Sequence, residues 1–138
     1  MASGMYNRFK ANLMNKEIDL EADTIKIILL DDSHAFAAAD NVIGDVDGNE
    51  LPTAGGYTQK TKALAGKAVT QGASTKWDAN DVEWADATFS AWHAVPYDDT
   101  IGTDDLICSI DFGGEKQVTA GIFKIQWHVN GIITLATA

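Results

Sequence analysis

The sequence predicts an all-β fold, an antiparallel β-sandwich or jelly roll with one short N-terminal helix. Roughly seven or eight short runs of β-branched and aromatic residues follow one another along the chain. Turn signals rich in Gly, Asn and Asp separate these runs, and strands do not alternate with helices as they would in a parallel sheet. The 138 residues are the usual size of one domain. We therefore expect residues 1–138 to form a single β-sandwich domain.

The first element is a short amphipathic helix over residues 5–15. Tyr6, Phe9 and Leu13 recur at helical spacing, and Asn15 marks the end of the pattern. A helix this short is only marginally stable by itself, so we expect it to pack against the sandwich.

The charge of this N-terminal segment differs from that of the rest of the chain. Arg8, Lys10 and Lys16 give residues 1–16 a charge of +3 with no acid, whereas the remaining residues carry −13. A basic segment on an acidic body can dock on an acidic neighbour, so we interpret residues 1–16 as a helical docking arm. Two alternatives stay open: the charges only solvate the helix, and the helix only closes one open end of the sandwich.

The first strand is predicted over residues 23–30, a β-branched run. Ile25, Ile27 and Leu29 share one face, while the residues between them face the other way. Residues 31–56 are predicted to form a long loop, with a helical turn around residues 40–44. Loops this long often carry function, which here would be contact with a partner.

The middle of the chain is predicted to hold three strands. They cover residues 57–70, 81–85 and 88–97, with a turn at 72–74 between the first two. Pro96 has no N–H to donate, so we expect an edge or a bulge there.

The C-terminal part is predicted to hold three more strands. They cover residues 106–112, 117–129 and 132–136. Gly113-Gly114 and Asn130-Gly131 are dipeptides typical of two-residue hairpin turns, so we expect two hairpins.

Composition argues against several classes of protein. Cys108 is the only cysteine, so folding needs no oxidising compartment. The N-terminus lacks the apolar core of a signal peptide, and the longest apolar run, residues 27–30, is too short to span a membrane. The net charge of −10 is unfavourable for binding phosphate backbones. We expect a soluble protein, made in a reducing cytoplasm, that binds neither nucleic acid nor membrane.

No arrangement of residues predicts catalysis. No serine lies in a Gly-x-Ser-x-Gly elbow, and Cys108 reads as a small buried residue within a strand. His34, His93 and His128 lack the spacing of metal ligands. We predict no catalytic residue, no bound metal and no cofactor, and hence a protein that is not an enzyme.

Two further hypotheses stay open, a calcium site and a sugar-binding surface. Oxygen ligands for a structural Ca²⁺ occur in residues 45–49, and again in 98–99 with 104–105, although neither matches the spacing of an EF-hand. Exposed aromatic rings could also stack on sugars, the candidates being Trp77, Trp92 and Tyr97.

Short motifs in a fixed order run through nearly the whole chain. They are Tyr6-Asn7-Arg8-Phe9-Lys10, Glu17-Ile18-Asp19-Leu20, Asp23-Thr24-Ile25-Lys26, Gly56-Tyr57-Thr58, Asn80-Asp81-Val82-Glu83-Trp84, Ala87-Thr88-Phe89-Ser90-Ala91, Tyr97-Asp98-Asp99, Ile110-Asp111-Phe112-Gly113, Phe123-Lys124-Ile125-Gln126-Trp127 and Asn130-Gly131-Ile132. In this order they resemble a family of small virion structural proteins of tailed phages. These are jelly-roll proteins that decorate or cement the outside of capsids.

The resemblance implies a mechanical role on the capsid exterior. Such a protein binds the lattice of the major capsid protein, as a homodimer or homotrimer, and stabilises the head against internal DNA pressure. It would be made in the host cytoplasm and act in the virion. The alternative is a receptor- or glycan-binding module of a tail or head fibre. Our candidates for capsid or partner contact are Tyr6, Arg8, Phe9, Lys10, Lys16, His34, Phe36 and Trp92.

Overall fold

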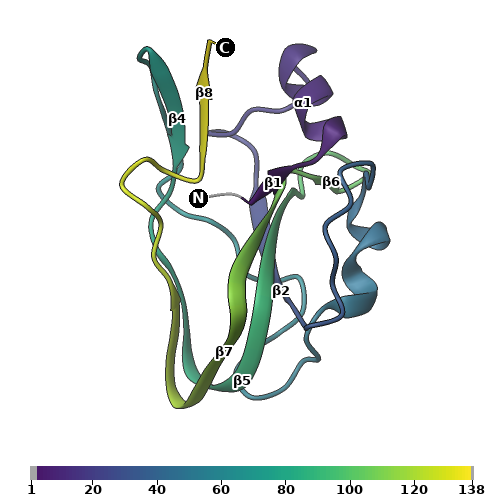
Figure 1. Cartoon of the computed structure of the whole chain (residues 1–138), viewed down its shortest axis with the longest axis vertical. Coiled ribbons are helices and arrows are strands. Elements are labelled where there is room, and N and C mark those ends of the chain that lie inside the picture. The colour runs from purple at the N-terminus through teal and green to yellow at the C-terminus, as the bar shows by residue number, and fades with distance from the viewer. Residues whose placement is uncertain (1–2, 138) are drawn as a thin grey trace.

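A computed structural model describes residues 3–137, which form two antiparallel sheets and one short α-helix (Figure 1). The all-β class predicted from the sequence is confirmed, as is the position of the helix. The two sheets face one another as the layers of a sandwich, and the helix lies at one end.

The larger sheet is built around one long hairpin. Strands β5 (Val82–Asp98) and β7 (Cys108–Ile125) pair antiparallel and make up most of it. Strand β2 (Ile25–Leu30) pairs with the other edge of β5. Two short strands complete the sheet: β1 (Gly4–Met5) pairs with β7, and β6 (Asp105–Leu106) pairs with the end of β5.

This long hairpin bends near the bottom of Figure 1. The pairing register shifts between Trp84 and Ala87 and again after Ala87. Asp86 and Ala120, on the two strands, adopt positive φ angles of 50° and 46°. Such irregularities bend and twist a strand pair, so the hairpin curls from one layer toward the other.

The smaller sheet has the order β3-β4-β8, so β8 lies at its edge. Its strands are β3 (Ala68–Thr70), β4 (Ser74–Asp78) and β8 (Ile133–Ala136). Helix α1 (Asn7–Met14) lies beside β8 at the upper end in Figure 1.

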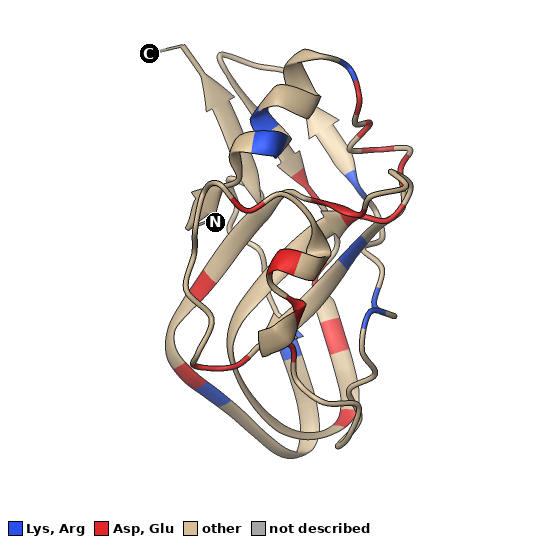
Figure 2. Ribbon diagram, turned by 90° about the vertical axis from the view of Figure 1, so that its right-hand side faces the viewer, with Lys and Arg blue, Asp and Glu red and all other residues tan. Residues whose placement is uncertain are grey.

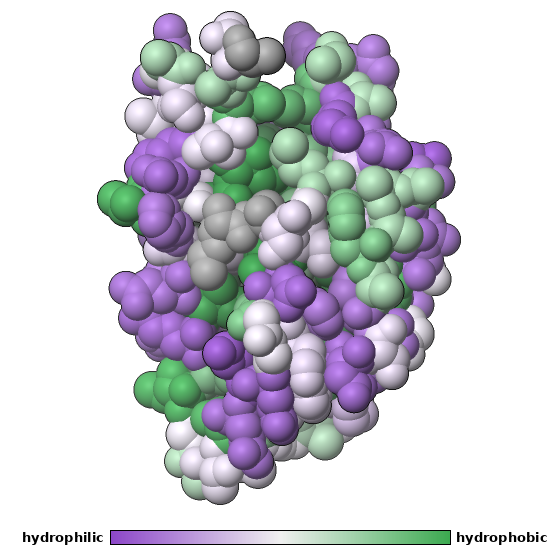
Figure 3. Space-filling view, viewed as in Figure 1, coloured by the Kyte–Doolittle hydropathy of each residue, from purple (hydrophilic) through white to green (hydrophobic). Residues whose placement is uncertain are grey.

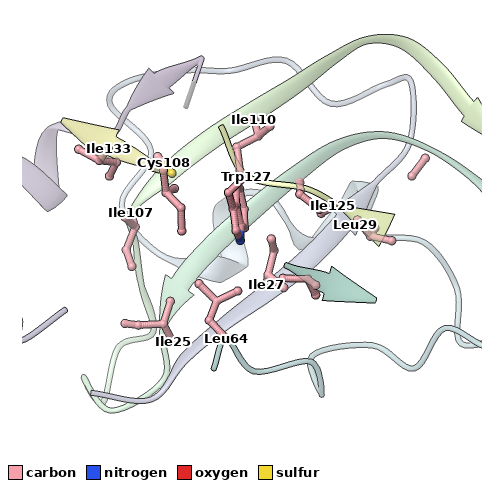
Figure 4. Packing of buried hydrophobic residues seen from close by; sticks show 14 of the residues in the cluster. Ile25, Ile27, Leu29, Leu64, Ile107, Cys108, Ile110, Ile125, Trp127 and Ile133 are labelled. Atoms are coloured by element: carbon pink, nitrogen blue, oxygen red, sulfur yellow. The ribbon is translucent and has the colours of Figure 1, made fainter. Parts of the chain in front are cut away.

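The main core lies between the sheets, and β2 contributes to it as predicted. Ile25, Ile27 and Leu29 are fully buried in the cluster that also contains Trp127 (Figure 4). Burying each aliphatic side chain stabilises the fold by roughly 1.5–3 kcal/mol. This row therefore anchors β2 in the main core.

The long loop after β2 covers the outer face of the larger sheet. Two 3₁₀ turns, η1 (Ile43–Asp45) and η2 (Asp47–Asn49), lie within it, close to the predicted helical turn. Ile43 and Val46 pack in a second cluster with Ile28 of β2. The loop thus closes a second, smaller core.

The strand predicted over residues 57–70 is wrong except for its last three residues, β3. The segment follows the edge of β2 through separate hydrogen bonds, from Leu64 N to Ile25 O at 2.8 Å and from Ile27 N to Lys62 O at 2.9 Å. Lys60 has a φ of 58°, which is incompatible with a regular strand.

The Gly113-Gly114 hairpin is also wrong. Both glycines have positive φ, but β7 continues through them as a bulge opposite the step from Ala91 to His93 of β5. A bulge and a tight turn both need glycine, so the dipeptide alone does not distinguish them.

The turn at Asn130-Gly131 is confirmed, but it does not form a hairpin. Gly131 N donates to His128 O at 2.8 Å, and the chain then joins the other sheet, where β8 pairs with β4. The preceding strand also ends earlier than predicted, at Ile125, and Val129 is 78% exposed.

Candidate docking surface

Helix α1 is fixed to the body of the sandwich at its N-terminal end. Asn7 N donates to Ala38 O at 2.9 Å, which ties the start of the helix to the long loop. Arg8 Nη1 lies 3.3 Å from Asp105 Oδ1, and Asn12 Nδ2 donates to Asp105 Oδ2 at 2.8 Å. The predicted docking arm and the start of the predicted contact loop therefore lie together.

Asp105 is the anchor of this attachment. Burial opposes its charge, but hydrogen bonds from Thr103, Asn12 and Arg8 hold its pKa below the ordinary value. Because a buried carboxylate with three donors stays ionised, the helix is held in one orientation at neutral pH.

The opposite side of α1 borders an apolar slot. We use the name α1–β8 slot for the groove of about 310 Å³ between the helix and the edge strand. Figure 3 shows apolar side chains gathered between the upper ends of β8 and α1. The residues that line the slot are Met5, Phe9, Lys10, Leu13, Met14 and Leu135.

The walls of this slot are unusually exposed for apolar side chains. Met14 is 90% exposed and Leu135 is 49% exposed. Val69 of β3, 42% exposed, borders the adjoining groove below Leu13. An apolar surface that spans two elements in this way is typical of an interaction site.

Basic side chains border the same end of the molecule. Lys10 and Lys16 are exposed, and neither forms an ion pair with any of residues 3–137. Figure 2 shows the basic residues on α1 and many of the acidic ones on the loops below it. The uneven charge predicted from the sequence is therefore present on the folded surface.

Three of the predicted contact residues lie inside the protein, which corrects their assignment. Tyr6 is 0% exposed, Phe9 is 1% exposed and His34 is 6% exposed. Tyr6 precedes α1 as its N-cap residue and packs in the second cluster, while Phe9 of α1 packs in the main core. Burial raises the pKa of Tyr6. His34 Nε2 lies 3.2 Å from Ser109 Oγ, and burial followed by the nearby His93 lowers its pKa.

The other predicted contact residues reach the surface. Arg8, Lys10 and Lys16 do so around α1. Phe36 is 43% exposed and packs on the Tyr6 ring with centroids 5.1 Å apart. Trp92 is half-buried at the bulge of β5, and the structure provides no contact that links it to the slot.

Sequence reasoning missed the apolar part of this surface. Met14 lies within the segment predicted to be helical, but its exposure depends on which face of the helix meets the core. Leu135 lies some 120 residues away in the chain, and only the folded structure brings the two together.

The alternative chemistries find little support within the described residues. No group of three or more His, Cys, Asp or Glu side chains among residues 3–137 is placed to hold a metal ion. Cys108 is buried, and burial raises its pKa to about 12, so its thiol is not a ready nucleophile. Trp77 and Tyr97 are each 2% exposed and offer no face to a sugar.

The possible calcium loop at residues 45–49 uses its carboxylates internally. Asp45 Oδ2 accepts hydrogen bonds from the backbone N–H groups of Asn41 and Val42. Asp47 Oδ2 pairs with Lys60 Nζ at 2.7 Å. Both carboxylates therefore have partners within the protein, and these contacts stabilise the fold of the loop.

No helix among residues 3–137 has the length and apolar character needed to cross a membrane. Comparison of the chain with protein-family models, curated proteins and solved structures finds no match.

Proposed function

We propose that the chain is a structural protein of a tailed phage that decorates or cements the outside of the capsid. The observation that carries the proposal is the surface at the α1 end, where exposed apolar side chains and unpaired lysines lie together on a protein of net charge −10. A surface of this composition suits a protein partner. The partner would be the major capsid protein.

The motifs behind the family resemblance fit a structural role, because their side chains build the fold. Phe9 and Trp84 belong to the main core. Asp81 Oδ1 accepts a hydrogen bond from Trp127 N at 3.1 Å and joins two motifs that are far apart in the chain. Residues of this kind define a scaffold, and a decoration protein needs a stable scaffold more than a reactive group.

The physical mechanism would be many weak contacts acting together. A capsid repeats the same surface many times, and self-association as a dimer or trimer lets one assembly bind several capsid subunits at once. Linked binding events gain roughly 10²–10⁴ in avidity without new contacts. Modest single interfaces would then hold the shell against the pressure of packaged DNA.

The test is a reconstruction of the phage particle whose genome encodes this chain, together with a particle that lacks it. We expect density of the sandwich in many copies on the outside of the head. Heads without the protein should release DNA at a lower temperature. Absence of the density from the head, or equal release temperatures for both particles, would contradict the cement role.

The alternative is a glycan- or receptor-binding module of a fibre, and the burial of Trp77 and Tyr97 counts against it. Trp92 is the remaining aromatic candidate. Binding on a glycan array that is lost in Trp92→Ala would favour this alternative.

A further inference from the structure

We infer that the α1–β8 slot binds an extended segment of a partner protein, which adds a strand to β8 and places an acidic side chain beside Lys10. The inference rests on the proposed function for the source of the segment, which is the capsid protein. It adds how the segment is recognised and what its chemistry is.

The backbone of β8 argues for an extended ligand. Within the described chain β8 pairs only with β4, as the last strand of the smaller sheet. Leu135 lines the slot together with residues of α1 and β1, so the slot lies along the free edge of β8. A free edge presents unpaired N–H and C=O groups, and a partner strand satisfies them in register.

The opposite wall of the slot argues for apolar side chains at alternate positions of that segment. Met5, Leu13 and Met14 face Leu135 across the slot, with the buried Phe9 as a floor. Methionine adapts its shape to different apolar partners. A strand laid along β8 would direct every second side chain onto this wall.

The charge of the slot argues for an acidic residue in the segment. Among residues 3–137, Lys10 is the only charged residue that lines it. Lys76 lies nearby, but its amine already donates to Val129 O at 3.1 Å. A second copy of this chain would compete for the slot, and the oligomeric state of the protein distinguishes the two occupants.

A peptide experiment tests the inference directly. The probe is a short peptide of alternating valine and threonine with glutamate at both ends, and its counterpart carries lysine at both ends. We expect the glutamate peptide to shift the backbone amide NMR signals of β8 and the methyl signal of Met14. The lysine peptide should bind several-fold more weakly, because its lysines would repel Lys10 where the glutamates would pair with it.

Two variants test the charge of the slot and its apolar wall separately. Lys10→Glu should reverse the preference, so that the lysine peptide binds more tightly than the glutamate peptide. Leu135→Glu places a charge in the apolar wall and should weaken binding of both peptides by about tenfold or more. Ile122→Glu is the matched control, because Ile122 is 61% exposed on β7 outside the slot, and it should bind as the unmodified protein does.

Three results would overturn the inference. They are no binding of either peptide, equal loss in Ile122→Glu and Leu135→Glu, and concentration-dependent dimerisation that Leu135→Glu abolishes, which would mean that a second copy fills the slot. Binding of each variant to heads that lack the protein keeps the two proposals apart. If the unmodified protein and Leu135→Glu bind heads equally well, the slot inference fails and the decoration role stands. If the protein binds the peptides but does not bind the heads, the decoration role fails and the inference about the slot stands.

Discussion

At the scale of single residues, the most informative group is the buried hydroxyl of Tyr57. It donates to Glu50 Oε2 at 2.7 Å and accepts from Leu29 N at 3.0 Å, while Lys60 N donates to the same carboxylate oxygen at 3.0 Å. Burial raises the pKa of Glu50, so this carboxylate depends on its donors. One hydroxyl thus connects β2 with the irregular segment that follows its edge.

Replacing Tyr57 with phenylalanine should therefore destabilise the protein although the ring still packs. The buried Glu50 carboxylate and the Leu29 N–H would each lose a partner, and we expect a loss of about 1–3 kcal/mol in the free energy of unfolding. Urea denaturation measures it. Tyr97→Phe is the control, because the Tyr97 hydroxyl makes no hydrogen bond within residues 3–137. Equal losses in both variants would show that the hydrogen bonds of the Tyr57 hydroxyl do not stabilise the protein.

A second residue, Asp98, makes stability depend on pH. It is 0% exposed, and burial, followed by the neighbouring Asp23, raises its pKa to about 7. Its Oδ1 accepts from the N–H groups of Thr100 and Ile101, whereas its buried Oδ2 has no donor within residues 3–137. A proton on Oδ2, shared with Asp23, would satisfy both carboxylates.

The sign of the effect follows from the raised pKa. The folded protein holds this proton more tightly than the unfolded chain, so the stabilisation is complete below about pH 4 and is lost as the pH rises through about 7. Asp98→Asn, whose amide can donate to Asp23, should remove this loss and be more stable than the unmodified protein at pH 8, by on the order of 1–2 kcal/mol. Thermal unfolding from pH 4 to 8 measures it. Asp32→Asn, at an exposed loop position, should follow the unmodified protein, and a parallel shift of both variants would contradict the assignment.

At the scale of elements, the connection from β7 to β8 depends on one glycine. Gly131 has a φ of 82°, and a Cβ atom there would lie 2.5 Å from Trp77 O of β4. Gly131→Ala should destabilise the protein by about 1–3 kcal/mol, because the side chain meets both a disfavoured backbone angle and a fixed carbonyl. Chemical denaturation measures the loss. Gly102→Ala, with no atom within 4 Å of its Cβ, is the control and should change stability little.

This turn also shows how far local sequence patterns predict the elements. Alternation in β2 and helical spacing in α1 are local properties, and both elements form close to where they were predicted. The partner of a strand is not a local property: Asn130-Gly131 predicts a turn but not that β8 will pair with β4. Gly113-Gly114 became a bulge because the long β5 offers pairing partners on both sides of it.

The surface at the α1 end was predictable only in part, for a similar reason. The basic character of residues 1–16 can be read from the sequence, and Lys10 and Lys16 do reach the surface. The helical pattern does not reveal which apolar side chains face inward, so Tyr6 and Phe9 were assigned to contact while Met14 was not. The position of α1 beside β8 depends on contacts between opposite ends of the chain.

At the scale of the whole molecule, the two sheets should differ in their resistance to opening. Long ladders join β5 to β7 and to β2, and five of the six residues of β2 are buried. The smaller sheet has three to five residues per strand, and β3 is exposed along its whole length. Regions with few buried contacts open at lower free energy than the core.

Hydrogen exchange of backbone amides measures this difference. We expect amides of β2 and of the central part of β5 to exchange by global unfolding, while those of β3 and β8 exchange through local opening at rates faster by a factor of about ten or more. An occupied slot should protect β8 and the end of α1 and leave β3 nearly unchanged, because only β8 would gain a strand partner. Uniform protection across both sheets in the free protein would contradict this view, and it would mean that the edge of β8 is already as stable as the core before any partner binds.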